Sequence, residues 1–80
     1  MDASERRFRT AVIGCGTIAY EHLPFLASSP LVELIAVCDR SRAAATFVRR
    51  RFGAAHAFTA YARMLTDAKP EVLHVLSPPH

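Results

Sequence analysis

The 80-residue chain has little of several residue types, and each shortage narrows what the protein can be. Its two cysteines are too few for the disulfide framework of a small secreted domain, so we expect reduced thiols and a cytoplasmic location. No apolar run approaches the roughly 18 residues that cross a membrane. Tryptophan is missing, and Lys69 is the only lysine among ten basic residues. The 51% apolar content favours one small packed domain.

The first seven residues are polar and no apolar core comes after them, so we expect a disordered tail over residues 1–7 and no secretory signal. The domain then occupies residues 8–80. A chain of this size buries only about 60% of the surface that it exposes when unfolded, so its stability is marginal without help.

The strongest motif lies in the stretch Thr10–Ala19. An apolar run leads into a glycine turn of the pattern G-x-G-x-x-A, made by Gly14, Cys15, Gly16, Thr17, Ile18 and Ala19. Gly14 suits a tight turn out of a strand, Gly16 lets a pyrophosphate approach the backbone, and Ala19 lets the next helix pack close to the strand. Free N–H groups at the helix start attract an anion. The pattern predicts a dinucleotide-binding turn.

Asp39 strengthens this interpretation. It ends the apolar run Leu34–Cys38 and lies about 20 residues past the glycine turn, where an acid that binds the ribose is expected. The alternative is an aspartate that merely solvates a loop at a strand end. Because strand, turn, helix, strand and acid occur in register, we favour cofactor binding.

Strand and helix patterns alternate along the chain. Ser41 is an expected helix N-cap, Gly53 an expected helix stop, and Pro24 is expected to kink or split the first helix. The expected strands cover residues 8–13, 32–39, 57–59 and 72–76, and the expected helices cover residues 17–27, 42–52 and 61–68. The expected inner helix faces are Ile18, Ala19, His22, Leu23 and Leu26; Ala44, Phe47, Val48 and Phe52; and Tyr61, Met64, Leu65 and Ala68.

Such alternation predicts an α/β fold with a parallel sheet and right-handed crossovers. We expect a partial doubly wound (Rossmann) sheet of about four strands in the order 3-2-1-4, with helices on both faces. The glycine turn and Ser77–His80 then meet between the first and fourth strands, where ligands bind in such sheets.

Other candidate sites are weaker. Cys15 lies within the glycine turn, where a helix N-terminus can lower a thiol pKa, but a small side chain tolerated in the turn is the favoured interpretation. Arg49–Arg51 lie at a helix end, where cations suit the dipole, and no stacking aromatics accompany them, so we expect no nucleic-acid partner. No two of the four histidines have metal-ligand spacing, so we expect no metal site.

Taken together, these motifs resemble the N-terminal part of the glucose–fructose oxidoreductase and inositol 2-dehydrogenase (Gfo/Idh/MocA) family. The matching text is AVIGCGTIAYEHLPFL, VELIAVCDRS and RFGAAHAFTAYARMLTDAKPEVLHVLSPPH. The resemblance implies an NAD(P)-dependent oxidoreductase that acts on a sugar, a polyol or a related hydroxy compound by hydride transfer. It also implies that Thr17 and Ile18 neighbour the phosphates and that Ser77 and Pro78 line the cofactor near its nicotinamide.

The chain departs from the family beyond its fourth strand. Members carry a Glu-Lys-Pro motif on the next strand and then a mostly β substrate domain, and neither is present in this sequence. Lys69 does not correspond to the lysine of that motif, so we assign no catalytic residue and expect no turnover by this chain alone. A small hydroxy-compound substrate is expected only in a full-length context.

Two alternatives stay open. One is a non-catalytic NAD(H)- or nucleotide-binding module, and the other is a truncated product without function. In either case the fourth strand leaves an apolar sheet edge, through which we expect self-association. For the cofactor, Asp39 repels a 2′-phosphate and favours NAD, while Arg40 and Arg42 make NADP possible if Asp39 turns away.

Overall fold

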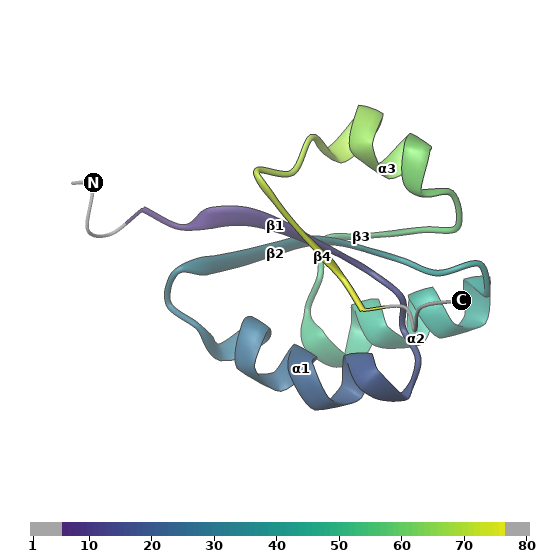
Figure 1. Cartoon of the computed structure of the whole chain (residues 1–80), viewed down its shortest axis with the longest axis horizontal. Coiled ribbons are helices and arrows are strands. Elements are labelled where there is room, and N and C mark those ends of the chain that lie inside the picture. Colours follow the sequence, from purple (N-terminus) through teal and green to yellow (C-terminus); the bar gives the residue numbers. More distant parts are fainter. Residues whose placement is uncertain (1–5, 77–80) are drawn as a thin grey trace.

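The computed structural model describes residues 6–76, with the side chains of Thr17 and Ile18 outside that description. Strands and helices alternate along the chain, and all strand pairs are parallel, in the order β3-β2-β1-β4 (Figure 1). The predicted fold and strand order are therefore confirmed. The elements are β1 (Phe8–Ile13), α1 (Thr17–Ser28), β2 (Val32–Cys38), α2 (Arg42–Phe52), β3 (His56–Phe58), α3 (Tyr61–Ala68) and β4 (Val72–Val75).

The sheet is the middle of three layers. Helices α1 and α2 cover one face, and α3 lies over the other (Figure 1). The central strands β1 and β2 are therefore buried on both sides, which explains their nearly continuous apolar sequences. The core on the α1/α2 face is Val12, Cys15, Ala19, Leu23, Val37, Val48 and Ala54, and the core on the α3 face is Ala11, Ile35, Ala36, Cys38, Met64 and Ala68.

Helix α2 has the caps that its sequence predicts. The Ser41 hydroxyl accepts a hydrogen bond from the Ala44 N–H at 3.2 Å, and so satisfies one free donor of the first turn. Gly53 ends the helix in the left-handed conformation, with φ of 77°, and its N–H donates to the Arg49 carbonyl at 2.9 Å. Both predictions are confirmed, and the first cap also fixes the loop after Asp39.

Helix α1 differs from prediction at two residues. It continues through Pro24 as one helix of 12 residues, so the proline does not split it. Pro24 is exposed, and water can satisfy the carbonyl that loses its helical partner. His22 is also exposed, so the predicted inner face is wrong at that position. Ala19 and Leu23 fix the buried side of this helix, both with no exposed surface.

The predicted inner faces of α2 and α3 are partly wrong. Phe47 is 55% exposed, and Ala45 takes the buried position instead. The Phe47 ring lies 6.2 Å from the Tyr20 ring, which places it at the outer seam between α1 and α2. On α3, Tyr61 is exposed, as is Leu65, so this helix covers the sheet through its two buried positions, Met64 and Ala68.

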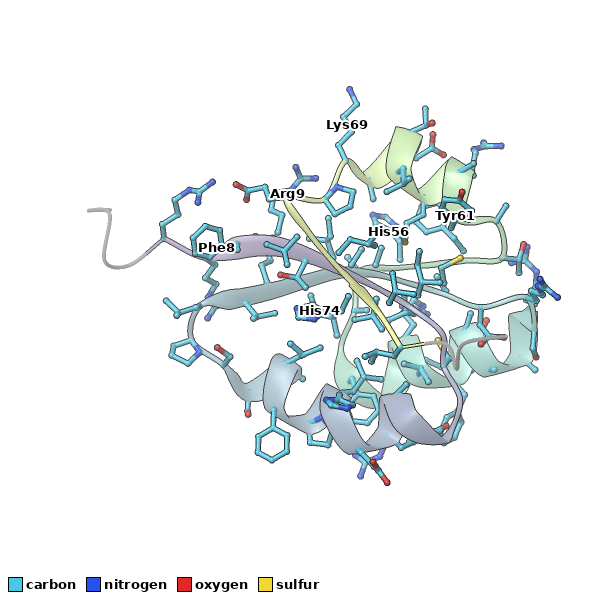
Figure 2. All side chains as sticks on the ribbon, in the orientation of Figure 1. Phe8, Arg9, His56, Tyr61, Lys69 and His74 are labelled. Atoms are coloured by element: carbon cyan, nitrogen blue, oxygen red, sulfur yellow. The ribbon has the colours of Figure 1, made fainter. Side chains whose placement is uncertain are left out.

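A polar cluster joins the ends of α3, β1 and β4 (Figure 2). The Arg9 guanidinium donates to the carbonyls of Ala68 and Lys69, the latter at 2.9 Å, and so caps the end of α3. The Glu71 carboxylate accepts the Arg9 backbone N–H at 3.0 Å and pairs with Arg6. These bonds lower the pKa of Glu71, with the Arg9 N–H as the main cause. The cluster fastens β4 beside β1 at the amino ends of both strands.

Candidate functional site

The glycine turn lies after β1 at the carboxyl end of the sheet, and its two glycines serve different physical needs. Gly14 has φ of 98°, a conformation that L side chains rarely adopt, and its N–H donates to the Cys38 carbonyl at 2.8 Å. Gly16 has an ordinary φ of −87°, and a Cβ built there would meet no atom within 4 Å. Of the two glycines in this turn, only Gly14 is therefore required by the backbone conformation. At position 16 the absent side chain leaves open space in front of the backbone.

That open space faces the start of α1. Gly16 is the N-cap and offers no side chain to the first turn, which contains no acidic residue. The first helical hydrogen bond runs from the Tyr20 N–H to the Gly16 carbonyl at 3.3 Å, so earlier N–H groups of this helix have no helical acceptor. Ala19 is fully buried in the core between α1 and the sheet, so the helix packs close to the strands. A helix start with free donors and clear space suits an anion such as a phosphate.

Asp39 lies directly beside the turn. One carboxylate oxygen accepts the Cys15 N–H at 2.9 Å, and the other accepts the Ser41 N–H at 2.8 Å. The carboxylate thus joins the turn after β1 to the turn after β2, and it is half-buried. A carboxylate offers about four lone-pair positions, so two backbone bonds leave capacity for two hydroxyl donors. An aspartate held in this way has a fixed orientation and unused acceptor capacity at the carboxyl end of the sheet.

Cys15 does not have the environment of a reactive thiol. Its side chain is 3% exposed, and its S–H points at the Cys38 carbonyl with a sulfur–oxygen distance of 3.7 Å. Burial, followed by the negative charge of Asp39, raises the pKa of the Cys15 thiol to about 12. The pKa of Cys38 is raised for the same two reasons. Both thiols remain protonated near neutral pH and act as small core side chains.

The remaining predicted residues divide by location. The backbones of Thr17 and Ile18 form the first turn of α1, and Arg40 is exposed next to Asp39. Ser77 and Pro78 lie outside the described residues. Lys69 precedes β4 at the amino end of the sheet, opposite the glycine turn, and points away from the sheet (Figure 2). The structure thus brings the turn and Asp39 together and separates the one lysine from both.

Sequence reasoning did not predict a cavity of about 340 Å³ at the carboxyl end of β3. It neighbours the Asp39 loop, because the Asp39 N–H donates to the carbonyl of Phe58, which lines the cavity. Arg63 and Asp67 in its wall pair with each other at 2.7 Å. The one signal in the sequence is Arg42, a candidate ligand for a 2′-phosphate. The lining residues are Arg42, Ala57, Phe58, Thr59, Ala60, Arg63 and Asp67.

Metal-ligating side chains are scattered over the described part of the chain. Within residues 6–76, no three His, Cys, Asp or Glu side chains are grouped so as to hold a metal ion. None of the helices in that range combines the length and the apolar content needed to cross a bilayer.

Comparison with known proteins gives consistent matches. The model of the Gfo/Idh/MocA group, described as an oxidoreductase family with an NAD-binding Rossmann fold, matches residues 8–80. D-glucoside 3-dehydrogenase of Escherichia coli (strain K12) is 34% identical over 71 residues, which are 88% of this chain and 20% of that protein.

Solved structures agree. The WlbA dehydrogenase of Chromobacterium violaceum, in complex with NADH and UDP-GlcNAcA, is 32% identical with a TM-score of 0.83, over 94% of this chain and 22% of that one. A 3-ketoreductase of Actinomadura kijaniata, in complex with TDP-benzene and NADP, is 32% identical with a TM-score of 0.82. The match covers 90% of this chain and 23% of the 3-ketoreductase chain. The chain therefore spans about a fifth of the length of the relatives that it matches.

Proposed function

The chain belongs to the Gfo/Idh/MocA family of oxidoreductases with an NAD-binding Rossmann fold, and we propose that its glycine turn and Asp39 bind the pyrophosphate and the adenosine ribose of NAD. The observation that supports this most is the pairing of an open helix start at Gly16 with a carboxylate fixed beside it. In the turn, the backbone from Gly14 to Ala19 would hold the phosphates. Arg40 would lie at the ribose side, and Ser77 and Pro78 near the nicotinamide.

We propose NAD rather than NADP as the preferred cofactor. Asp39 accepts two backbone N–H bonds, at 2.9 and 2.8 Å, so turning its carboxylate away would forfeit both. A fixed negative charge at the ribose opposes a 2′-phosphate. Relatives at the same identity to this chain carry NADH in one case and NADP in the other, so similarity alone does not decide between them.

In a longer protein, this unit would present the nicotinamide to a sugar, a polyol or a related hydroxy compound, and the bound cofactor would supply hydride transfer. The residues of this chain would serve binding and orientation only. Lys69, the only lysine, lies at the opposite end of the sheet from the glycine turn, so we assign it no role in the reaction. The 80-residue chain should therefore bind cofactor without turnover.

Calorimetric titration with NAD and with NADP tests the proposal, using the natural chain, Asp39→Ala and the control Asp67→Ala. We expect NAD to bind about tenfold or more tightly than NADP. Asp39→Ala should weaken NAD binding by at least about tenfold and leave NADP binding unchanged or stronger, since the repelling charge is gone. Asp67→Ala should bind as the natural chain does. Equal affinities for both dinucleotides, or an Asp39→Ala variant that loses both to the same degree, would contradict it.

A further inference from the structure

Ser41 holds the Asp39 side chain through a backbone group. The Ser41 N–H donates to one carboxylate oxygen of Asp39 at 2.8 Å, and the other oxygen accepts the Cys15 N–H at 2.9 Å. A carboxylate with a single bond on one oxygen can still swing about that bond. With one bond on each oxygen, the plane and the direction of this carboxylate are both fixed.

Helix α2 in turn fixes Ser41. The Ser41 hydroxyl accepts the Ala44 N–H at 3.2 Å, and the Ser41 carbonyl accepts the Ala45 N–H at 3.0 Å as a bond of the first helical turn. The backbone of Ser41 is extended, with φ of −81° and ψ of 115°, as is usual for an N-cap. The start of α2 therefore aims the N–H that holds the carboxylate.

The backbone of Asp39 is held separately from its side chain. The Asp39 N–H donates to the Phe58 carbonyl at 3.1 Å, which attaches this end of β2 to β3. Cys38, the preceding residue, is in register with Phe58 in the same strand pair. A change at Ser41 should therefore loosen the carboxylate and leave the strand in place.

We propose that Ser41 is the positioning residue that makes Asp39 selective for NAD, an inference that rests on the proposed function of Asp39 at the adenosine ribose. Selectivity against a 2′-phosphate needs a negative charge that does not turn away, and the Ser41 N–H keeps it from turning. Each carboxylate oxygen accepts one backbone bond and keeps a lone pair for a ribose hydroxyl. A loosened carboxylate binds the diol less well and also moves away from the 2′-phosphate of NADP.

Four variants separate this role from the stability of α2. Ser41→Pro removes the N–H together with the hydroxyl, and the φ of −81° is close to the range of proline. Ser41→Ala keeps the N–H and removes the hydroxyl cap, whereas Ser41→Thr keeps both groups. The matched control is Gly53→Ala, which strains the other end of α2, where φ is 77°, and leaves the contacts of Asp39 intact.

Calorimetric titration with NAD and with NADP gives the ratio of the two dissociation constants for each variant. The preference for NAD should fall to near equality in Ser41→Pro and by at least about threefold in Ser41→Ala, and Ser41→Thr should match the natural chain. Ser41→Ala and Gly53→Ala should both melt roughly 4–8 °C below the natural chain, since each weakens one end of α2. Gly53→Ala should nevertheless keep the natural preference, because a loss of stability alone does not distinguish the two dinucleotides.

Two results of the titrations would overturn the proposal. One is a ratio that stays constant in both Ser41→Pro and Ser41→Ala, and the other is a ratio that falls as much in Gly53→Ala as in Ser41→Ala. If Ser41→Pro does not fold, Ser41→Ala decides by the same criterion.

Amide hydrogen exchange without ligand distinguishes failure of this inference from failure of the proposed function. In Ser41→Ala, the Cys15 N–H should exchange at least about threefold faster relative to the Gly14 N–H, because the carboxylate that accepts it is held less firmly. The Gly14 N–H is the internal reference, since it donates to the Cys38 carbonyl at 2.8 Å. An unchanged ratio of exchange rates would overturn the positioning role even if the chain prefers NAD. Faster exchange at Cys15 in a chain that binds neither dinucleotide would overturn the proposed function, and the selectivity with it, while it confirms that Ser41 holds the carboxylate.

Discussion

Replacing Asp39 by asparagine should destabilise the folded chain even without cofactor, because the carboxylate joins two turns. The asparagine side chain keeps one oxygen acceptor and turns an NH₂ donor toward the other backbone N–H. One charge-assisted hydrogen bond is lost, worth about 1.5–3 kcal/mol, and the partial exposure of Asp39 favours the lower half of that range, about 2 kcal/mol. For a domain of this size, this corresponds to a fall in melting temperature of roughly 10 °C.

Circular dichroism melts without ligand measure this effect, with Asp67→Asn as the matched control. Asp67 pairs with Arg63 across one turn on the surface of α3, and such exposed pairs contribute only about 0.3–0.5 kcal/mol. The control should melt within about 3 °C of the natural chain. If both variants melt at the same temperature, the two bonds of Asp39 do not tie the turns together, and Asp39 is a loop residue that water solvates.

Individual contacts support three more predictions. Gly14→Ala should lower the free energy of unfolding by about 1–2 kcal/mol, because Gly14 has a positive φ. Gly16→Ala should leave the thermal melt unchanged and weaken NAD binding at least about tenfold. Equal melting temperatures for the two variants would contradict this. The pKa of Cys15 is raised to about 12, so its thiol is protonated and unreactive in the folded chain. In a Cys38→Ser variant, Cys15 should therefore react with a thiol reagent at pH ~8 only as fast as the chain unfolds. Rapid labelling of the folded chain would instead show that the thiol is accessible. The lowered pKa of Glu71 implies stability that is present above the ordinary value of 4.5 and is lost as the pH falls through the folded-state pKa. In urea unfolding, Glu71→Gln should therefore be less stable than the natural chain at pH ~6, and the difference should shrink as the pH is lowered through the folded-state pKa; a difference that stays constant with pH would contradict the sign.

Sequence patterns predicted the sheet and the glycine turn because both depend on local requirements. The apolar run before Gly14 and the run Leu34–Cys38 fit strands buried on both faces, and the structure has β1 and β2 there. A conformation with positive φ at Gly14 and a buried Ala19 come from the same motif. Alternation and crossover handedness give a parallel α/β sheet, and the order 3-2-1-4 follows from the doubly wound pattern that the glycine turn indicates.

Other features depend on tertiary contacts that no local pattern encodes. By spacing alone, Phe47 fits the inner face of its helix. In the structure its ring instead lies beside the Tyr20 ring at the exposed contact between α1 and α2, and Ala45 is the buried residue. The exposure of Pro24 decides that α1 continues through it. The bond between Asp39 and the Cys15 N–H joins residues 24 positions apart and becomes visible only when β1 and β2 lie side by side.

The cavity beside β3 was missed for a similar reason. Its lining comes from the start of α2, the end of β3 and one side of α3. Apart from Arg42, these segments carried no signal of a ligand site, and they meet only because the crossover brings α3 over β2 and β3. A cavity so close to Asp39 makes the location of bound dinucleotide the central question for this chain.

Amide chemical-shift mapping during NAD titration answers that question most directly. Binding at the proposed site should shift the amides of Cys15, Gly16 and Ser41 first and most, since they lie at the open helix start and beside Asp39. Shifts confined to Thr59, Ala60 and Arg63 would place the ligand in the cavity beside β3 and would contradict the assignment of the glycine turn as the dinucleotide site.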